Sequence, residues 1–359
     1  MSNTYIKMGG DVEDTYIKNG QEWMCKIVDA AHKFDTVLIG MSEGPALEEL
    51  NYQGKKFLQI LKELCESNGW NQHKFQFTLP NLVQDQNVWP NTKFSGSSTQ
   101  STNIEDNLFL HTQLVTHDIE KIFKYTFGTF VVRSSWDRLL ISSFLYANYK
   151  DKTFQTYCRS LENPGHMLHM DLDKLLHLKS CDKKIDAILL GQISNFISVL
   201  PIEKTKEPPI SSRTAGNKSG HEFPWVEGPV NAEILSWYNN IFVDVVCEKM
   251  ITGQTFFPTE KTARPLATKT PFLMMAAPNY IKNLRKLGFR SFGQFWDEGY
   301  DYQQGVQRVE SIKCIIDDLG QLESKQLQVI HEQMTPILEH NYKTYKELTP
   351  KKILSVFKI

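Results

Sequence analysis

The sequence predicts an α/β protein of two domains with parallel sheets, followed by a C-terminal helical segment. Three observations lead to this prediction. Short runs of β-branched and aromatic residues alternate with stretches that are apolar at helical spacing, which is typical of β-α-β units. At 359 residues the chain is long enough for two domains of ordinary size. Its second half contains uninterrupted apolar runs, a pattern that indicates strands buried on both faces.

The first expected domain spans residues 1–124 and contains one clear β-α-β unit. Residues 20–33 are expected to be helical, and residues 35–40 (DTVLIG) are expected to form a strand. Residues 55–68 (KKFLQILKELCESN) carry apolar positions along one helix face, and Gly69 follows as a stop signal. The alternating stretch HKFQFTLPN then indicates a second strand. Strands joined through a helix predict a parallel sheet.

The second expected domain spans residues 125–325. FGTFVV at 127–132 indicates its first strand, and residues 136–149 (WDRLLISSFLYANY) indicate the helix that follows. A further apolar strand is expected in residues 241–246 (IFVDVV). Residues 271–277 (PFLMMAA) form a short run bounded by prolines, which suits a buried parallel strand and is too short for a core helix.

A helix start lies between the last two of these strands. Thr259 can cap a helix N-terminus and so begin a helix that runs through Arg264. Proline is tolerated in the first turn of a helix, so we expect Pro265 to lie there and the helix to begin near Thr262 at the latest. After the 271–277 strand the order continues with a turn and another helix. It therefore resembles the surroundings of a phosphate site in a doubly wound sheet.

The remaining C-terminal sequence is helical in pattern. Residues 279–287 have apolar positions at helical spacing, and Gly288 ends them. Carboxylates in residues 296–301 (WDEGYD) suit either a catalytic role or a structural cap for that helix. Residues 306–345 form an apolar helical stripe. We expect residues 326–359 to be a separate unit of helices that packs back on the N-terminal domain.

The helix start at Thr259 carries residue types that suit a nucleotide. Free N–H groups and the helix dipole favour an anion such as phosphate at a helix N-terminus. Lys261 and Arg264 could meet a diphosphate, while Glu260 could accept hydrogen bonds from ribose hydroxyls. The alternative is that Glu260 and Lys261 simply occupy a solvated helix start.

The string Phe257-x-Thr259-Glu260-Lys261, followed by a helix and a Pro-Phe strand, resembles a known donor-binding motif. It is similar to Y-x-T-E-K of the family ten glycosyltransferases, the α1,3-fucosyltransferases, which holds a sugar nucleotide. It also resembles phage-encoded proteins that carry TEKTxKPI, PF, LRxLGFxTF and WDExYD in this order. Phe257 stands where the fucosyltransferases have Tyr, so a hydrogen bond from that hydroxyl is absent. The strong part of the resemblance covers about fifty residues.

The resemblance implies further donor-binding residues. The fucosyltransferases place an arginine after the strand that corresponds to 127–132, and the phage proteins show R-x-x-x-x-R there. Arg133 and Arg138 match that pattern, and either could meet phosphate oxygens. The alternative for Arg138 is a pairing with an acidic neighbour on its own helix. Glu248 matches a V-x-E-T-like string of the phage proteins, and the alternative is a pairing with a lysine.

The resemblance also implies a fold and a reaction. The expected fold is GT-B-like, with two Rossmann-like domains and a cleft between them. In such enzymes the carboxyl ends of the N-terminal strands face the donor domain, and an inverting transfer needs a carboxylate that takes the proton of the acceptor hydroxyl. Glu43 lies just past the 35–40 strand and is the candidate catalytic base. The alternative is an exposed acidic residue in a Ser-Glu-Gly-Pro turn.

The expected function is transfer of a sugar from a nucleoside diphosphate sugar to an acceptor hydroxyl, such as one on a modified base of phage DNA. The alternative is a nucleotide-binding or structural phage accessory protein of the same fold that has no activity. We expect no cofactor and no metal. Arginine and lysine can stabilise the leaving diphosphate, and the nearest approach to a D-x-D motif, at 171–173, lies outside the expected cleft.

Composition excludes several classes of protein. Lysine and arginine number 40 against 41 acidic residues, so a broadly basic nucleic-acid surface is not expected, although a local groove could still hold DNA. The six cysteines are scattered singly, which indicates neither a zinc module nor a disulfide framework. No run of eighteen apolar residues and no signal peptide is found, so we expect no membrane partner and a cytoplasmic location, in the host if the chain is phage-encoded.

Overall fold

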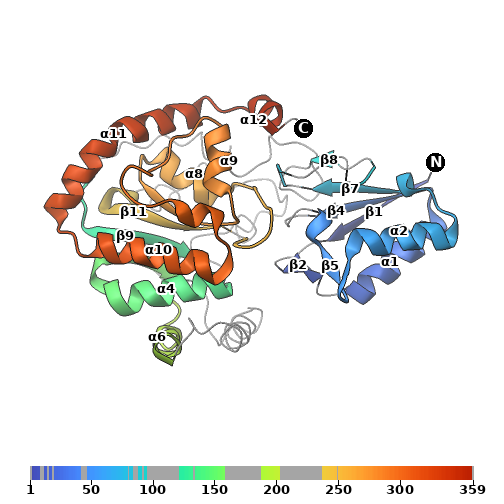
Figure 1. Cartoon of the computed structure of the whole chain (residues 1–359), viewed down its shortest axis with the longest axis horizontal. Coiled ribbons are helices and arrows are strands. Elements are labelled where there is room, and N and C mark those ends of the chain that lie inside the picture. Colours follow the sequence, from blue (N-terminus) through green and yellow to red (C-terminus); the bar gives the residue numbers. More distant parts are fainter. Residues whose placement is uncertain are drawn as a thin grey trace, which may run out of the picture.

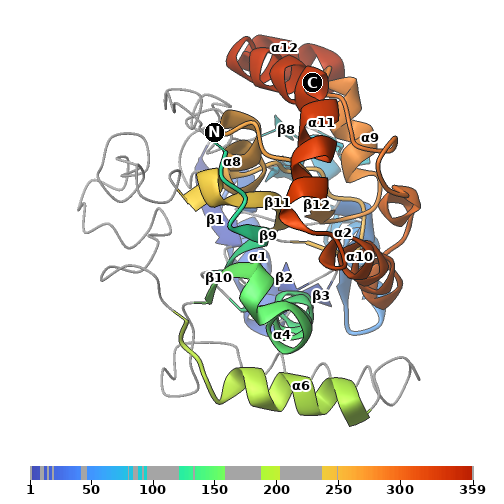
Figure 2. The same ribbon diagram turned by 90° about the vertical axis from the view of Figure 1, so that its left-hand side faces the viewer.

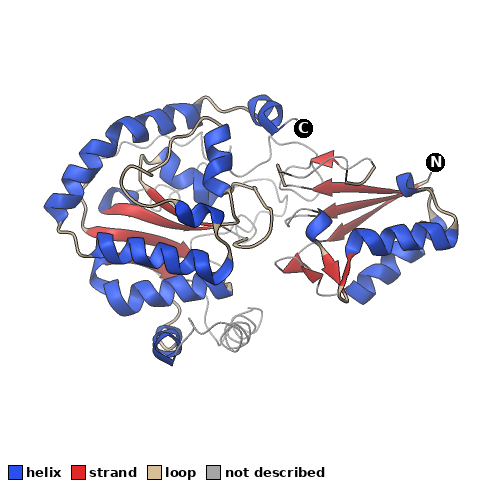
Figure 3. Ribbon diagram, in the orientation of Figure 1, coloured by secondary structure: helices blue, strands red, loops and turns tan. Residues whose placement is uncertain are grey.

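The computed structural model contains two α/β domains, each built on a parallel sheet, and helices at the C-terminal end of the chain (Figure 1, Figure 3). The predicted α/β class and parallel sheets are therefore confirmed. The core of the N-terminal domain is formed by residues between Trp23 and Trp89, and the core of the second domain by residues between Phe123 and Ile353 together with Leu82. The structure describes residues 2–8, 12–13, 16–17, 20–41, 47–79, 81–83, 88–90, 93–94, 121–131, 134–157, 187–202, 237–248 and 250–357.

The N-terminal sheet has the strand order β1-β4-β7-β8, with every neighbouring pair parallel. Its strands are β1 (Asn3–Met8), β4 (Thr36–Met41), β7 (Phe75–Leu79) and β8 (Lys93–Phe94). Helices α1 (Gly20–Lys33) and α2 (Phe57–Asn68) connect the first three strands and lie on the same side of the sheet (Figure 1). The β-α-β prediction is confirmed, and β1 adds an edge strand that was not predicted.

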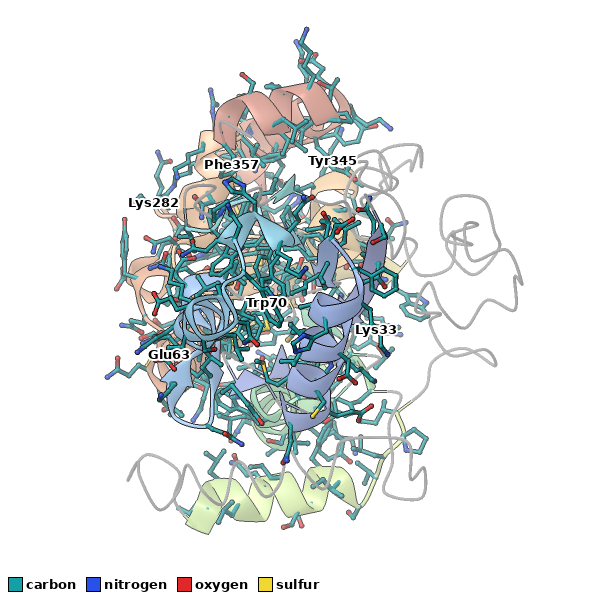
Figure 4. The ribbon with its side chains drawn as sticks, turned by 90° about the vertical axis from the view of Figure 1, so that its right-hand side faces the viewer. Lys33, Glu63, Trp70, Lys282, Tyr345 and Phe357 are labelled. Atoms are coloured by element: carbon teal, nitrogen blue, oxygen red, sulfur yellow. The ribbon has the colours of Figure 1, made fainter. Side chains whose placement is uncertain are left out.

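Apolar side chains from both helices and the sheet form the core of this domain. Ile27 of α1 and Leu61 of α2 are fully buried against Ile39 of β4 and Phe77 of β7. Trp70, which follows α2, packs edge-on against His32 of α1 with ring centroids 4.9 Å apart (Figure 4). The apolar face of each helix is therefore turned toward the sheet, where its side chains are removed from water.

A small mixed sheet borders this domain. It has the order β2-β3-β5-β6, from β2 (Val12–Glu13), β3 (Tyr16–Ile17), β5 (Asn51–Tyr52) and β6 (Lys55–Lys56). The helix expected from residue 55 therefore begins two residues later, because Lys55 and Lys56 pair with β5. Its predicted stop is confirmed, since Gly69 has φ 67° and donates its N–H to carbonyls of the last turn.

The second sheet has the strand order β10-β9-β11-β12, again with every pair parallel. Its strands are β9 (Tyr125–Val131), β10 (Thr153–Tyr157), β11 (Ile241–Cys247) and β12 (Phe272–Met275). All residues of β11 and β12 are buried, which explains their continuous apolar sequences. The strands predicted around 127–132, 241–246 and 271–277 are confirmed, whereas β10 was not predicted.

Helices cover both faces of this sheet (Figure 1). Helices α4 (Trp136–Tyr149) and α10 (Gly305–Gly320) lie on one face, and α6 (Ala187–Ile197) packs on the outside of α4 (Figure 2). Helices α8 (Glu260–Ala267) and α9 (Tyr280–Lys286) lie on the other face. The helix predicted at 136–149 is confirmed at both ends, and Gly288, with φ 97°, follows α9 as expected. Short 3-10 turns complete the fold: Leu47–Glu49, Gln72–Lys74, Lys150–Lys152, Tyr238–Asn240 and Gly299–Tyr302.

The C-terminal helices α11 (Ser324–Lys346) and α12 (Pro350–Phe357) pack on the second domain. The buried face of α11 lies against α8, and Phe357 packs on Phe256 with ring centroids 5.3 Å apart (Figure 4). This packing differs from the expectation that these helices return to the N-terminal domain. The apolar stripe of α11 is buried against α8, within the second domain. None of the helices in the described part of the chain is long and apolar enough to cross a membrane.

Candidate functional site

The order of the strands singles out one place on the second sheet. After β9 the chain moves outward to β10, whereas after β11 it moves the other way to β12. The loops that leave β9 and β11 therefore diverge at the carboxyl edge of two neighbouring parallel strands. In open α/β sheets, ligands bind in the crevice at this kind of switch point. Helix α4 begins just after β9 and helix α8 follows β11, so both helix N-termini belong to this edge.

The start of α8 is built by Thr259, Glu260 and Lys261. Thr259 is the N-cap residue, and its Oγ1 accepts a hydrogen bond from the Lys261 N–H at 3.3 Å. The Lys261 Nζ lies 2.8 Å from Glu260 Oε1 and 3.2 Å from Thr259 Oγ1. The predicted cap at Thr259 is confirmed, and the ammonium of Lys261 is held against the first turn of the helix.

The charges of this turn are arranged around Glu260. Burial by itself raises the pKa of the Glu260 carboxyl, but the positive charges of Lys261 and Arg264 and a hydrogen bond from Lys261 bring that pKa below its ordinary value. Glu260 is therefore ionised at neutral pH, although it is only 9% exposed. Two cations and one anion thus lie along the first turn and a half of α8.

Glu248, directly after β11, fastens the start of α8 to the sheet. Its Oε1 accepts hydrogen bonds from the Thr259 N–H at 3.0 Å, the Thr262 hydroxyl at 2.6 Å and the Tyr280 hydroxyl at 3.2 Å. Its Oε2 accepts from the Thr259 hydroxyl at 2.8 Å. Glu248 was predicted to bind the donor; its carboxylate instead receives protein donors from α8 and α9. Glu248 therefore fixes the start of α8 relative to the sheet.

Arg138 joins α4 to the same point. Its Nη2 donates to the main-chain oxygen of Glu248 at 2.8 Å, and the side chain is 7% exposed. Glu248 thus links the beginnings of both helices, through its carbonyl to α4 and through its carboxylate to α8. At the N-cap of α4 the buried Ser135 hydroxyl has no hydrogen-bond partner within the described residues.

The structure brings together six of the predicted site residues. Arg138, Glu248, Thr259, Glu260 and Lys261 meet at the carboxyl edge, and Arg264 interacts electrostatically with Glu260 from one turn further along α8. The other two, Glu43 and Arg133, lie outside the residues that the structure describes.

Pro265 is placed differently from the prediction. Helix α8 begins at Glu260, so the proline is its sixth residue and lies beyond the first turn. Because proline has no N–H, the main-chain carbonyl of Lys261 lacks its usual partner four residues on. The helix ends two residues later, at Ala267, which limits the cost of this lost hydrogen bond.

Sequence reasoning missed several residues that shape the site. Thr262 and Tyr280 hold Glu248, and their hydroxyl oxygens lie 2.9 Å apart. Thr262 directly follows Lys261 in the Thr-Glu-Lys-Thr string, but nothing in the sequence connects it with Glu248. Tyr280 comes from α9, which lies beyond β12 in the chain. A buried polar pair below α8, Tyr238 and Asp244, was also missed. The one available signal was an acidic residue inside the apolar run IFVDVV.

The N-terminal domain touches the loop that leads into α8. Asn81, just beyond β7, accepts a hydrogen bond from the Phe256 N–H at 3.1 Å and donates to the Gln254 carbonyl at 2.8 Å. Leu82 donates its N–H to the Phe256 carbonyl at 3.1 Å, and its side chain belongs to the core of the second domain. Glu49, after β4, accepts from the Gln254 N–H at 2.6 Å. Loops at the carboxyl ends of β4 and β7 therefore meet the loop after β11.

The carboxylates of residues 296–301 prove structural where their partners are described. Asp301 accepts the N–H groups of Ile281 and Lys282, at 2.9 Å and 3.0 Å, and so caps α9. It also pairs with Arg308, whose side chain is fully buried. Glu298 accepts from Phe292 N–H at 2.8 Å and pairs with Arg285. The capping interpretation of this segment is confirmed.

Comparison of the chain with protein-family models, curated proteins and solved structures finds no match. Within the described residues, no group of three or more His, Cys, Asp and Glu side chains is arranged to hold a metal ion. The functional assignment therefore depends on the geometry of the carboxyl edge and on the residues at the start of α8.

Proposed function

We propose that the protein is a glycosyltransferase with two Rossmann-like domains in a GT-B-like arrangement, which transfers a sugar from a nucleoside diphosphate sugar to an acceptor hydroxyl. One observation carries the proposal: Thr259, Glu260 and Lys261 begin a helix at the switch point of a parallel sheet. Both features are general devices for binding phosphate.

The roles of the residues follow from their charges and positions. Lys261 binds the diphosphate, and this contact replaces part of its ion pair with Glu260. Glu260, ionised and only partly exposed, accepts hydrogen bonds from ribose hydroxyls. Glu248 and Arg138 keep the starts of α8 and α4 in place. The cations stabilise the negative charge that grows on the leaving diphosphate, which is the main electrostatic demand of glycosyl transfer.

The arrangement of the domains supports a reaction that uses both. Loops at the carboxyl ends of β4 and β7 contact the loop after β11, so the functional edges of the two sheets face each other. Figure 1 shows the strands of both domains directed toward the region between them. Glu43, two residues beyond β4, is our proposed base for the acceptor hydroxyl.

A thermal-shift screen tests the donor site. UDP-glucose, GDP-mannose, ADP-glucose and dTDP-glucose are added to the wild type, to Lys261→Ala and to Lys282→Ala. Lys282 is an exposed lysine in the first turn of α9 and serves as the matched control. One nucleotide sugar is expected to stabilise the wild type by about 2.7 kcal/mol at a hundredfold excess over its dissociation constant. The shift should persist in Lys282→Ala and disappear in Lys261→Ala. No shift with any of the four, or a shift that Lys261→Ala retains, would contradict the donor site.

Turnover separates an enzyme from a protein that only binds nucleotides. The nucleotide sugar that binds is incubated with DNA that contains hydroxymethylated bases, and in parallel with oligosaccharides. Release of the nucleoside diphosphate that depends on one acceptor, and that Glu43→Gln abolishes, is the expected result. Binding without release in the presence of either acceptor would favour the alternative of a binding protein without catalytic activity.

A further inference from the structure

Asp244 is a carboxyl group inside the most buried strand of the second sheet. It stands in the middle of β11, whose residues are all buried, and it is 2% exposed. Its Oδ2 accepts a hydrogen bond of 2.7 Å from the hydroxyl of Tyr238, which is itself 1% exposed. Burying a carboxyl in such a place costs free energy, so its presence calls for a compensating role.

Charged groups from three further segments of the chain lie around this pair. Tyr238 comes from the 3-10 turn before β11, and Arg264 interacts with both Tyr238 and Asp244 from α8. Lys121, before β9, faces Asp244 and donates to the Tyr238 carbonyl at 2.7 Å and to the Thr270 hydroxyl at 2.6 Å. His331 of α11 faces Lys121 in turn. The cluster is therefore a network of mixed charge that lies directly below α8.

Arg264 connects this network with the start of α8. Side chains on a helix lean toward its N-terminus, so Arg264 extends back toward the first turn. It interacts there with Glu260, four residues earlier, while it also contributes a hydrogen bond to Tyr238. Tyr238 thus stands between the arginine and the buried carboxyl. The Tyr238 hydroxyl is hydrogen-bonded to both side chains, so it couples the position of Arg264 to that of the Asp244 carboxyl.

We propose that Tyr238 and Asp244 are positioning residues, which hold Arg264 in the orientation that meets the phosphate of a nucleoside diphosphate sugar at the start of α8. The inference rests on the proposed function and adds to it the buried residues that control the affinity of that site. Arg264 is only 8% exposed, so its guanidinium has little freedom to turn, and its interactions with Tyr238, Asp244 and Glu260 contribute to its direction.

The arrangement predicts a specific dependence on pH. Burial raises the pKa of Asp244 to about 7, against the opposing effects of the Tyr238 hydrogen bond and of Arg264 and Lys121. The carboxyl therefore becomes negative, and attracts Arg264 through Tyr238 more strongly, as the pH rises through neutrality. A nucleotide sugar is a suitable probe because its diphosphate is a diester that takes up no proton in this range.

The test is calorimetric titration of the wild type and three variants with UDP-glucose, GDP-mannose, ADP-glucose and dTDP-glucose at pH 6 and pH 8. Tyr238→Phe removes the hydroxyl, and Asp244→Asn removes the charge but keeps an acceptor for Tyr238. Tyr300→Phe is the control, because Tyr300 is an equally buried tyrosine of the same domain that lies against Met274 of β12. At pH 8 the first two variants should bind about tenfold more weakly than the wild type, the loss expected for one hydrogen bond to a charged group.

The outcomes separate this inference from the function on which it rests. Weaker binding in Tyr238→Phe and Asp244→Asn at pH 8, with a smaller loss at pH 6 and wild-type affinity in Tyr300→Phe, supports the positioning role. Wild-type affinity in both variants at both pH values overturns the positioning role and leaves the donor site intact. Binding of none of the four sugars to the wild type overturns the donor site and the positioning role together. Should Tyr238→Phe fail to fold, Asp244→Asn alone decides between the first two outcomes.

Discussion

The free energy of unfolding of Asp244→Asn should increase relative to that of the wild type as the pH rises from 5 to 7. Burial raises the pKa of this carboxyl in the native state from its ordinary value of 3.8 to about 7. Between these values the native state keeps a proton that the unfolded chain has released. Stability from this group is therefore fully present below pH 3.8 and is lost as the pH rises through about 7. Asparagine has no proton to lose, so the variant lacks this decline.

The size of the effect follows from the shift in pKa. The full difference between the two values corresponds to about 4 kcal/mol. Part of it is already lost at pH 5, where the unfolded carboxyl is mostly ionised, so about 2 kcal/mol remains between pH 5 and pH 7. The wild type should therefore lose about 2 kcal/mol relative to Asp244→Asn over this interval.

Urea unfolding of both proteins at pH 5, 6 and 7 measures the difference. The comparison is needed because His331 acts in the opposite direction: burial, with the nearby charge of Lys121, lowers its pKa to about 4, so its contribution to stability increases with pH in this range. His331 is present in both proteins and cancels. Burial also lowers the pKa of Lys121 to about 7, and the resulting change in stability falls mainly above pH 7. A constant difference between the two proteins at all three pH values would refute the reasoning and show that Asp244 is ionised in the native state throughout.

Two further predictions concern the groups that fix the helix starts. Glu248→Ala should lower the free energy of unfolding by about 3 kcal/mol, because it leaves the buried donors of Thr259, Thr262 and Tyr280 without their acceptor. Glu248→Gln keeps one acceptor oxygen, so it should lower the free energy of unfolding clearly less in the same urea titration. Equal losses in the two variants would contradict this account. Asp301→Ala should lower the free energy of unfolding by about 3 to 5 kcal/mol, because it removes the cap of α9 and leaves Arg308 as an unpaired buried charge. Asp297→Ala, at an exposed neighbouring position, should change the free energy of unfolding by no more than about 0.5 kcal/mol. Similar values for the two variants would show that the capping contacts contribute little.

Elements whose signals are local could be predicted from the sequence. The helix at Trp136–Tyr149 was predicted at both ends, because its apolar periodicity is strong and a strand precedes it closely. Thr259 was identified as a cap because a capping residue acts within three residues of itself. The parallel sheets followed from the alternation of strands and helices. In each case the physical cause lies within one turn or one strand of the residue concerned.

Features that depend on distant partners could not be predicted. Strand β1 has a mixed polar sequence and is a strand because it pairs with β4 along its whole length. Lys55 and Lys56 suit a helix, yet they pair with β5 and delay α2. The position of Glu248 past a strand gave no indication that Tyr280 of α9 would donate a hydrogen bond to its carboxylate. Helix α11 carried an apolar stripe without any indication of which domain would cover it.

Asp244 shows how stability and binding can be separated at one residue. If the buried carboxyl served only the fold, a neutral asparagine of the same shape would be at least as good, because the charge costs stability near neutral pH. A positioning role requires the opposite response from binding, since Arg264 loses the negative charge that orients it through Tyr238. Gain of stability together with loss of affinity in Asp244→Asn therefore identifies a group kept for function at the expense of the fold. Gain of stability with unchanged affinity would instead show that the orientation of Arg264 does not depend on the charge of Asp244.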